Sequence, residues 1–365
     1  MDLALFFAQT RLRAALSVSL LLALSFVVTG FVASAYRRER RSLGELHYDR
    51  AQSLVKQSRL DDGIEEYRKA LIFSPDKTEY RLSLATALTD AGRLDEAQRH
   101  LEQLLQEDPT NGVINLMLAR VALRQGHVQL GIEYYQRAVY EYWPAAEIED
   151  RRRARWELIT QLGKTGRRNE AVGELMQLYA NAPPDPSQKA RIGFMLLKYG
   201  ATSEASQVFR DLVRDAPEEQ EAHRGLGDVY FSSGNLVSAR HEFQRALRLD
   251  PDDHESRDAL ALTNAAIELD AALPGITSEE RFRRSQNLLN RVVAHLEQCS
   301  SSDAPQSELS AAQKMLRIKH SADADIGLEL QSEAQQLWKN RAQFCGPTST
   351  PDQALEVALA GVGHE

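Results

Sequence analysis

The sequence predicts an all-α fold in which pairs of helices repeat along the chain. Proline recurs at intervals of 34 residues in two series, Pro75 with Pro109, and Pro183 with Pro217 and Pro251. A small residue stands twelve positions before each of these prolines: Gly63, Ala97, Ala171, Ala205 and Ala239. No alternating strand pattern bounded by hairpin turns is evident. A fixed period of this length indicates a repeat architecture built from copies of one supersecondary unit.

Each period carries the features of two helices joined by a turn. A large residue stands eight positions before each proline: Tyr67, Leu101, Leu175, Phe209 and Phe243. A glycine or serine ends the first helix of each pair: Ser58, Gly92, Gly166, Gly200 and Gly234. Proline closes the second helix because it cannot continue one. The small residues are expected where one helix crosses its partner, since a larger side chain would push the two apart.

This pattern resembles the tetratricopeptide repeat, a helix–turn–helix of 34 residues. The resemblance covers residues 44–253, and the last unit carries it most fully, through Leu226, Gly227, Tyr230, Ala239, Phe243, Ala246 and Pro251. It implies a solenoid of about six units, in which each unit buries its apolar face only against its neighbours. The units are placed at 44–77, 78–111, 112–145, 152–185, 186–219 and 220–253.

The third unit departs from the pattern at its end. Trp143 stands where the proline is expected, and residues 146–151 are inserted before the fourth unit. The stretch 140–156 carries two Tyr, two Trp and several Arg. It is either an element that sets binding specificity or a tolerated insertion at one edge of the array.

An apolar run precedes the repeats. Residues 14–36 contain no charged side chain, and about 20 apolar residues are enough to span a bilayer. We therefore expect a transmembrane helix at 14–36 that acts as a signal anchor after an N-terminal flank, 1–13. The alternative is a cleaved signal peptide, because Ala33-Ser34-Ala35 resembles a cleavage site.

The predicted location is the cell membrane, with a single span, and the side on which the repeats lie stays open. Four Arg follow the span and two precede it, which favours a cytoplasmic repeat domain. Cys299 and Cys345 favour the extracytoplasmic side if they pair, because disulfides persist in oxidising compartments. Helices expected at 277–299, 307–319 and 324–344 would bring both cysteines to one end. Two unrelated thiols are the other interpretation.

The region after the repeats is predicted to contain three parts. Residues 254–273 form a helix that caps the last repeat, as a terminal repeat requires. Residues 277–345 form a helical C-terminal module. Residues 346–365 are expected to be a flexible tail, although the segment Asp352 to Leu359 could form a short helix on contact.

Charge and motifs exclude several classes of function. The chain has a net charge of −8, and residues 1–41 contribute +4, so residues 42–365 carry −12. A strongly acidic body argues against nucleic-acid binding, which requires a basic face. No catalytic motif, Cys-x-x-Cys pair or His-Glu-x-x-His sequence is found, so we expect no enzyme activity, no cofactor and no metal. The alternative is an enzyme or an accessory enzyme subunit whose chemistry lies in residues 277–345.

The expected function is therefore binding. In tetratricopeptide repeat proteins the first helix of each unit lines a concave groove, and the family's groove positions fall here on Leu116, Arg120, Arg124, Arg153, Trp156, Lys164, Phe194, Leu197 and Lys198. Arg and Lys beside apolar side chains suit protein or peptide segments that carry acidic and apolar residues. The same residues could instead complete the packing between repeats.

The layout resembles bacterial single-span tetratricopeptide repeat proteins that assist envelope assembly or chaperone exported proteins. The resemblance implies a membrane-tethered scaffold that binds partner polypeptides in its groove.

Overall fold

The fold is known from a computed structural model that describes residues 2–181, 185–299, 306–319, 324–345 and 352–360, with side chains in the first helix from Leu24 onward. In these residues the predicted all-α fold of repeated helix pairs is confirmed. They contain no β-strand, only an isolated bridge between Asn111 and Tyr142. The chain divides after Gly166 into two compact units, and each unit is described by itself.

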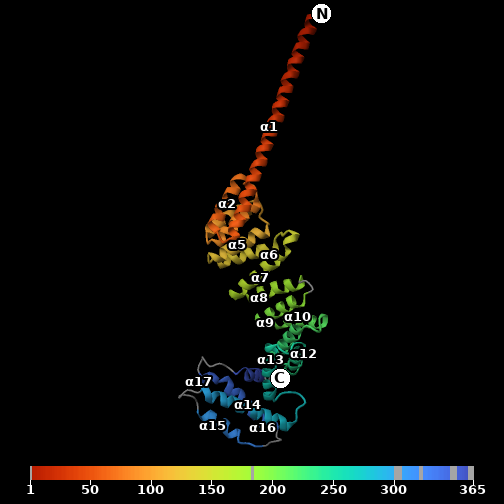
Figure 1. The fold of residues 1–365 in the computed structure, drawn as a ribbon. Helices are drawn as coiled ribbons and strands as arrows, with labels where there is room; N and C mark the ends of the chain where they lie inside the picture. The colour runs from red at the N-terminus through yellow and green to blue at the C-terminus, as the bar shows by residue number, and fades with distance from the viewer. Residues whose placement is uncertain (1, 182–184, 300–305, 320–323, 346–351, 361–365) are drawn as a thin grey trace. The chain divides into compact units, whose positions relative to one another are not determined.

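The first unit consists of consecutive helices that pack as antiparallel pairs (Figure 1). Its elements are α1 (Asp2–Lys56), α2 (Leu60–Phe73), α3 (Thr78–Asp90), α4 (Leu94–Glu107), α5 (Gly112–Arg124), α6 (Val128–Tyr140), the 3-10 turn η1 (Ala145–Glu147) and α7 (Ile148–Lys164). The last turns of α1 pair with α2, and α3 with α4. Tyr48, Leu84 and Leu101 belong to the continuous core that these pairs bury.

The second unit continues with helix pairs and ends in a bundle. Its elements are α8 (Arg168–Ala180), α9 (Pro186–Lys198), α10 (Thr202–Asp215), α11 (Gln220–Ser232), α12 (Leu236–Leu249), α13 (His254–Leu269), α14 (Ser278–Cys299), α15 (Gln306–Met315), α16 (Ala324–Lys339), α17 (Arg341–Cys345) and α18 (Gln353–Ala360). Helices α9 and α11, the first helices of successive repeats, contact each other. This contact places the groove positions of two repeats side by side.

The turn inside each pair has a recurring geometry. At the turn from α3 to α4, Gly92 has a φ of 75°, its N–H donates to Thr89, and the next N–H donates to Leu88. This is the Schellman arrangement, which satisfies the free carbonyls at a helix end and favours glycine because φ is positive. Ser58 adopts the same conformation, with a φ of 62°. The turn residues identified in the sequence therefore stand where the backbone requires them.

The small residues lie where large rings approach. A Cβ at Gly225 would lie 2.1 Å from the ring of Phe209, and one at Gly193 would lie 2.5 Å from the same ring. The ring is thus held between α9 and α11. Gly227 faces Phe243 in the same way, at 2.6 Å. Close packing of this kind leaves no room for a methyl group, so glycine is required at these three positions.

The irregular third repeat is closed by a tryptophan. Trp143 is buried, its Nε1 donates to the carbonyl of Ala138 at 2.6 Å, and a Cβ at Gly112 would lie 2.1 Å from its ring. The inserted residues form η1 and the first turn of α7. The insertion therefore lengthens the first helix of the fourth repeat.

The predicted membrane span is corrected. Among the residues whose side chains the structure describes, no helix is long and apolar enough to cross a membrane. The apolar run ends at Tyr36. Helix α1 then continues through the charged residues 37–41 without a break. The prediction of a transmembrane helix at 14–36 and of a single-pass location in the cell membrane is wrong on this finding.

The C-terminal helices form a bundle with a core of its own, which includes Phe282, Leu289, Leu337 and Phe344. The single helix predicted at 324–344 is two helices, α16 and α17, with Asn340 between them. The flexible tail is corrected in part: α18 packs on α13 and buries Leu355. Residues 346–351 and 361–365 lie outside the described residues.

Candidate partner-binding surface

The nine predicted groove residues divide between the two units. Phe194, Leu197 and Lys198 lie on α9 in the second unit, and the other six lie on α5 and α7 in the first unit. A side chain of either set can contact a partner only where it is not already used in packing.

In the first unit, Arg120 is used to join two helices. Its guanidinium donates to both carboxylate oxygens of Glu157 on α7, at 2.6 and 3.0 Å, and the hydroxyl of Tyr135 donates to the same carboxylate at 2.7 Å. Burial raises the pKa of Glu157, the hydrogen bonds from Arg120 and Tyr135 lower it, and the net effect is a lowered pKa. A bidentate pair of this kind is strong and geometrically specific, so Arg120 contributes to packing between repeats.

Three further residues of the first unit have partners or are buried. Leu116 is buried. Arg124 donates to the carbonyl of Thr89 at 2.5 Å, and Arg153 pairs with Asp150 at 2.9 Å. Surface pairs of this type contribute little stability and can be exchanged for a ligand.

Trp156 and Lys164 complete the set on α7. Trp156 is half-buried and Lys164 is exposed in the last turn of the helix. Lys164 therefore presents its charge to solvent.

In the second unit, Phe194 lies at the centre of a ring contact. It is half-buried, its ring centroid lies 5.0 Å from that of Phe209, and the guanidinium carbon of Arg224 lies 4.5 Å from the centroid. A cation over an aromatic face is attracted by the quadrupole of the ring. Arg224 comes from α11, so this contact fixes the side chains of two successive first helices against each other.

Arg224 is also held by acidic residues. It pairs with Glu255 at the start of α13 and lies 3.9 Å from Glu221. One turn further along α11, burial raises the pKa of Asp228 to about 6, although the charge of Arg224 opposes the shift. Arg224 and Asp228 were not among the predicted binding residues. Their position four residues apart on a first helix was the available signal, because such residues share a face.

Leu197 and Lys198 lie one turn after Phe194. Leu197 is half-buried, and Lys198 is exposed in the last turn of α9. Residues three and four positions apart in a helix are neighbours on its surface. We call Phe194, Leu197, Lys198, Arg224 and Asp228 the α9–α11 face. It contains apolar area, an exposed cation and a half-buried carboxylate.

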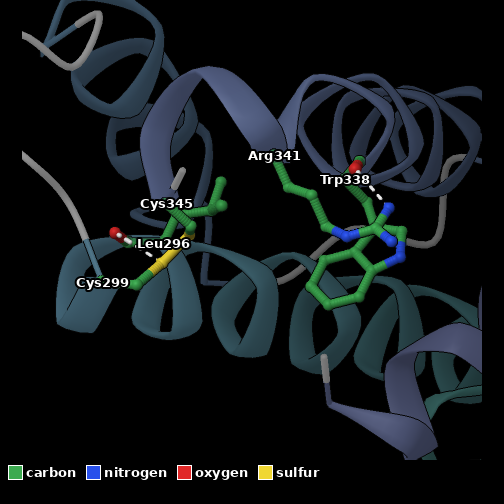
Figure 2. The surroundings of a disulfide bond; sticks show 5 residues. All are labelled: Leu296, Cys299, Trp338, Arg341 and Cys345. Atoms are coloured by element: carbon green, nitrogen blue, oxygen red, sulfur yellow. Dashed lines mark hydrogen bonds between the residues drawn. A yellow bond between two sulfur atoms is a disulfide. The ribbon is translucent and has the colours of Figure 1, made fainter. Parts of the chain in front are cut away.

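The two cysteines form a disulfide in the bundle. Cys299 at the end of α14 is bonded to Cys345 at the end of α17, and their Cα atoms are 4.8 Å apart (Figure 2). This Cα separation is ordinary for a disulfide. Beside the bond, the guanidinium carbon of Arg341 lies 4.9 Å from the ring centroid of Trp338.

Sequence reasoning missed a histidine near this bond. A ring nitrogen of His295 and the sulfur atoms of Cys299 and Cys345 all lie within 4.8 Å of one another. No metal site was expected because the sequence contains no Cys-x-x-Cys or His-Glu-x-x-His motif. The spacing His295-x-x-x-Cys299 on one helix was the signal that could have indicated it.

Family models of the tetratricopeptide repeat match residues 48–112, 88–142 and 196–254. The chain is 28% identical over 178 residues to superkiller complex protein 3 of Mus musculus, which is 47% of this chain and 11% of that protein. It is 25% identical over 223 residues to protein O-mannosyl-transferase TMTC1 of Homo sapiens, which is 60% of this chain and 20% of that protein. The chain thus spans a small part of either relative.

Among solved structures, YrrB, a tetratricopeptide repeat protein with an unusual peptide-binding site, is 17% identical with a TM-score of 0.40. The alignment covers 53% of this chain and 96% of that one. The family matches coincide with the helix pairs, the glycine turns and the ring contacts described above. Residues 48–142 and 196–254 therefore carry tetratricopeptide repeats.

Proposed function

We propose that this protein is a scaffold that binds a polypeptide segment on the α9–α11 face. Tetratricopeptide repeats typically mediate protein–protein interactions, and the predicted residues of α9 combine two half-buried apolar side chains with an exposed cation. The observation that carries the proposal is the row on α9, where the half-buried Phe194 and Leu197 stand beside the exposed Lys198.

The chemistry of this row indicates the kind of segment. An apolar side chain of the partner can pack on Phe194 and Leu197, since aromatic anchors contribute most of the energy in such contacts. A carboxylate of the partner can pair with the exposed Lys198. The residue four positions earlier on the same helix is the apolar Phe194. Asp228 repels a second carboxylate at the α11 end. The proposed partner is thus a peptide with an apolar residue followed by one acidic residue.

The fixed geometry of Phe194 also supports this proposal. Arg224 covers one face of its ring and Phe209 contacts it from α10. A ring held in place before binding loses little conformational entropy when a partner arrives, and this preorganisation favours affinity.

The test is selection of a random peptide library on the full chain. We expect enriched peptides to share an apolar residue near an Asp or Glu, and Phe194→Ala and Lys198→Glu to weaken their binding about tenfold or more, as loss of an anchor contact does. Lys314→Glu is the matched control, because Lys314 is also exposed in the last turn of a helix, α15. Peptides that bind all three variants as they bind the unmodified chain would refute the α9–α11 face as the binding surface.

A further inference from the structure

Three metal-binding side chains converge at the end of the C-terminal bundle. His295 and Cys299 lie four residues apart on α14, so their side chains share one face of the helix. Cys345 approaches from the end of α17. A ring nitrogen of His295 and the two sulfur atoms lie within 4.8 Å of one another, and all three residues are partly accessible.

The imidazole of His295 packs against an aromatic ring, and one of its nitrogens lacks a hydrogen-bond partner. Its ring centroid lies 5.2 Å from that of Trp338 on α16, at an interplanar angle of 59°. Its Nε2 atom is buried and has no hydrogen-bond partner within the part of the chain that the structure describes. A buried polar atom left without a partner is destabilising. Coordination of a metal ion would give the imidazole a polar partner, which its packing against Trp338 does not provide.

We propose that reduction of the Cys299–Cys345 disulfide creates a Zn²⁺ site, with His295, Cys299 and Cys345 as ligands. Two thiolates and one imidazole are a ligand set that zinc accepts, with water in the fourth position. The two thiolate charges balance those of the ion, which suits a half-buried position. With Zn–S bonds of about 2.3 Å, tetrahedral geometry separates the two sulfur atoms by about 3.8 Å. The ring nitrogen and the two sulfur atoms already lie within 4.8 Å of one another, so small side-chain movements can bring them to this arrangement.

The redox step requires a two-electron reductant, which we take to be a dithiol. Its two sulfur atoms form their own disulfide, and the bond between Cys299 and Cys345 is replaced by two S–H groups. Binding of Zn²⁺ then displaces both protons and leaves two thiolates on the ion. The disulfide and the metal site exclude each other. Either one ties α14 to α17, so the bundle would keep this cross-link under oxidising and reducing conditions.

This inference is independent of peptide binding on the α9–α11 face, and its test uses Co²⁺ as a spectroscopic substitute for Zn²⁺. The full chain is reduced with a phosphine, which becomes the phosphine oxide by taking oxygen from water, and the reagent is removed under anaerobic conditions. We expect the reduced chain to bind one equivalent of Co²⁺ with thiolate-to-metal charge-transfer absorption, and Zn²⁺ to displace it. The oxidised chain is expected to show neither signal.

Three variants at the ligand positions and one control variant assign the ligands. The double variant Cys299→Ser with Cys345→Ser should lose the charge-transfer absorption, and His295→Ala should weaken Zn²⁺ binding about tenfold or more. His254→Ala is the control, because His254 is exposed at the start of α13 and its loss should change nothing. Circular dichroism of each variant checks that the helices are retained, and His295→Gln repeats the test with a larger side chain. A reduced chain that binds no stoichiometric metal, or an affinity that neither His295 variant lowers, would overturn the proposal.

Discussion

The repeat helices of the second unit and its C-terminal bundle are both all-α, yet different contacts hold them together. In the repeats, one ring is seated against glycine in successive helix pairs, as Phe209 is against Gly193 and Gly225. In the bundle, the core is irregular and α14 is tied to α17 by a disulfide. The repeats thus depend on one contact made many times, whereas the bundle depends on contacts that each occur once.

The difference should appear first in the disulfide. A cross-link between residues 46 apart stabilises a domain by about 4 kcal/mol in the chain-entropy account. We expect Cys299→Ser with Cys345→Ser to lose about 2–4 kcal/mol, with hydrogen exchange accelerated in α14–α17 and little changed in α9–α12. Equal loss of protection in the repeats would show that the bundle and the repeats are not stabilised separately.

The next effect concerns the ring contact of the repeats. Gly225→Ala places a methyl group against Phe209, and the ring cannot move away because Gly193 lies against it as well. We expect a loss of about 1–3 kcal/mol in urea unfolding, the usual cost of overpacking. Gly173→Ala is the matched control: Gly173 lies inside α8 with nothing within 4 Å of an added Cβ, so this change should stabilise by about 0.5–1 kcal/mol. A shift in the same direction for both variants would contradict the role of the contact.

A smaller effect separates packing from binding in the first unit. Arg120→Ala removes the two hydrogen bonds to Glu157. We expect a loss of about 1–2 kcal/mol, because the pair is charged but partly exposed. Peptide binding on the α9–α11 face should be unchanged. If stability stays constant while binding weakens, Arg120 is a ligand contact and its packing role is wrong.

The smallest effect is a pH dependence in the last repeat. The hydrogen bond with Glu242 raises the pKa of His223, although burial opposes it. Its other ring nitrogen faces the carbonyl of Pro217 at 3.0 Å, so both nitrogens face acceptors and the imidazolium is favoured. A raised folded-state pKa adds stability that is complete below about pH 6.5 and is lost as the pH rises through the folded value.

We therefore expect the stability difference between the unmodified chain and His223→Gln to be about 1 kcal/mol at acidic pH and to shrink with rising pH, as measured by urea unfolding across the range. His254→Gln, on the exposed start of α13, should leave the pH dependence in place. A difference that grows with pH would reverse the assigned charge state.

The sequence was informative wherever a contact repeats. The period and the turn at Gly92 leave a mark every 34 residues, so the repeated helix pairs could be predicted. Contacts that occur once leave no such mark. The partner of Arg120 is Glu157, 37 residues away across the insertion, and no period indicated it.

The remaining differences have the same origin. The apolar run at 14–36 was read from composition, and the described part of α1 contains no span of sufficient length. Residues 346–365 were expected to be a flexible tail with a short helix forming only on contact, and eight residues could not indicate the α13 surface on which α18 packs. His295 and Cys299 lie close together because they stand four positions apart on α14. Cys345 joins them only through the fold, from the end of α17.

The central claim is that a peptide binds the α9–α11 face, and hydrogen exchange of the full chain with and without a selected peptide tests it most directly. Bound partners slow amide exchange where they stabilise the backbone. We expect the peptide to slow amide exchange in α9 and α11, and we expect Lys198→Glu to abolish this protection. Protection confined to α14–α17, with α9 and α11 unchanged, would contradict it.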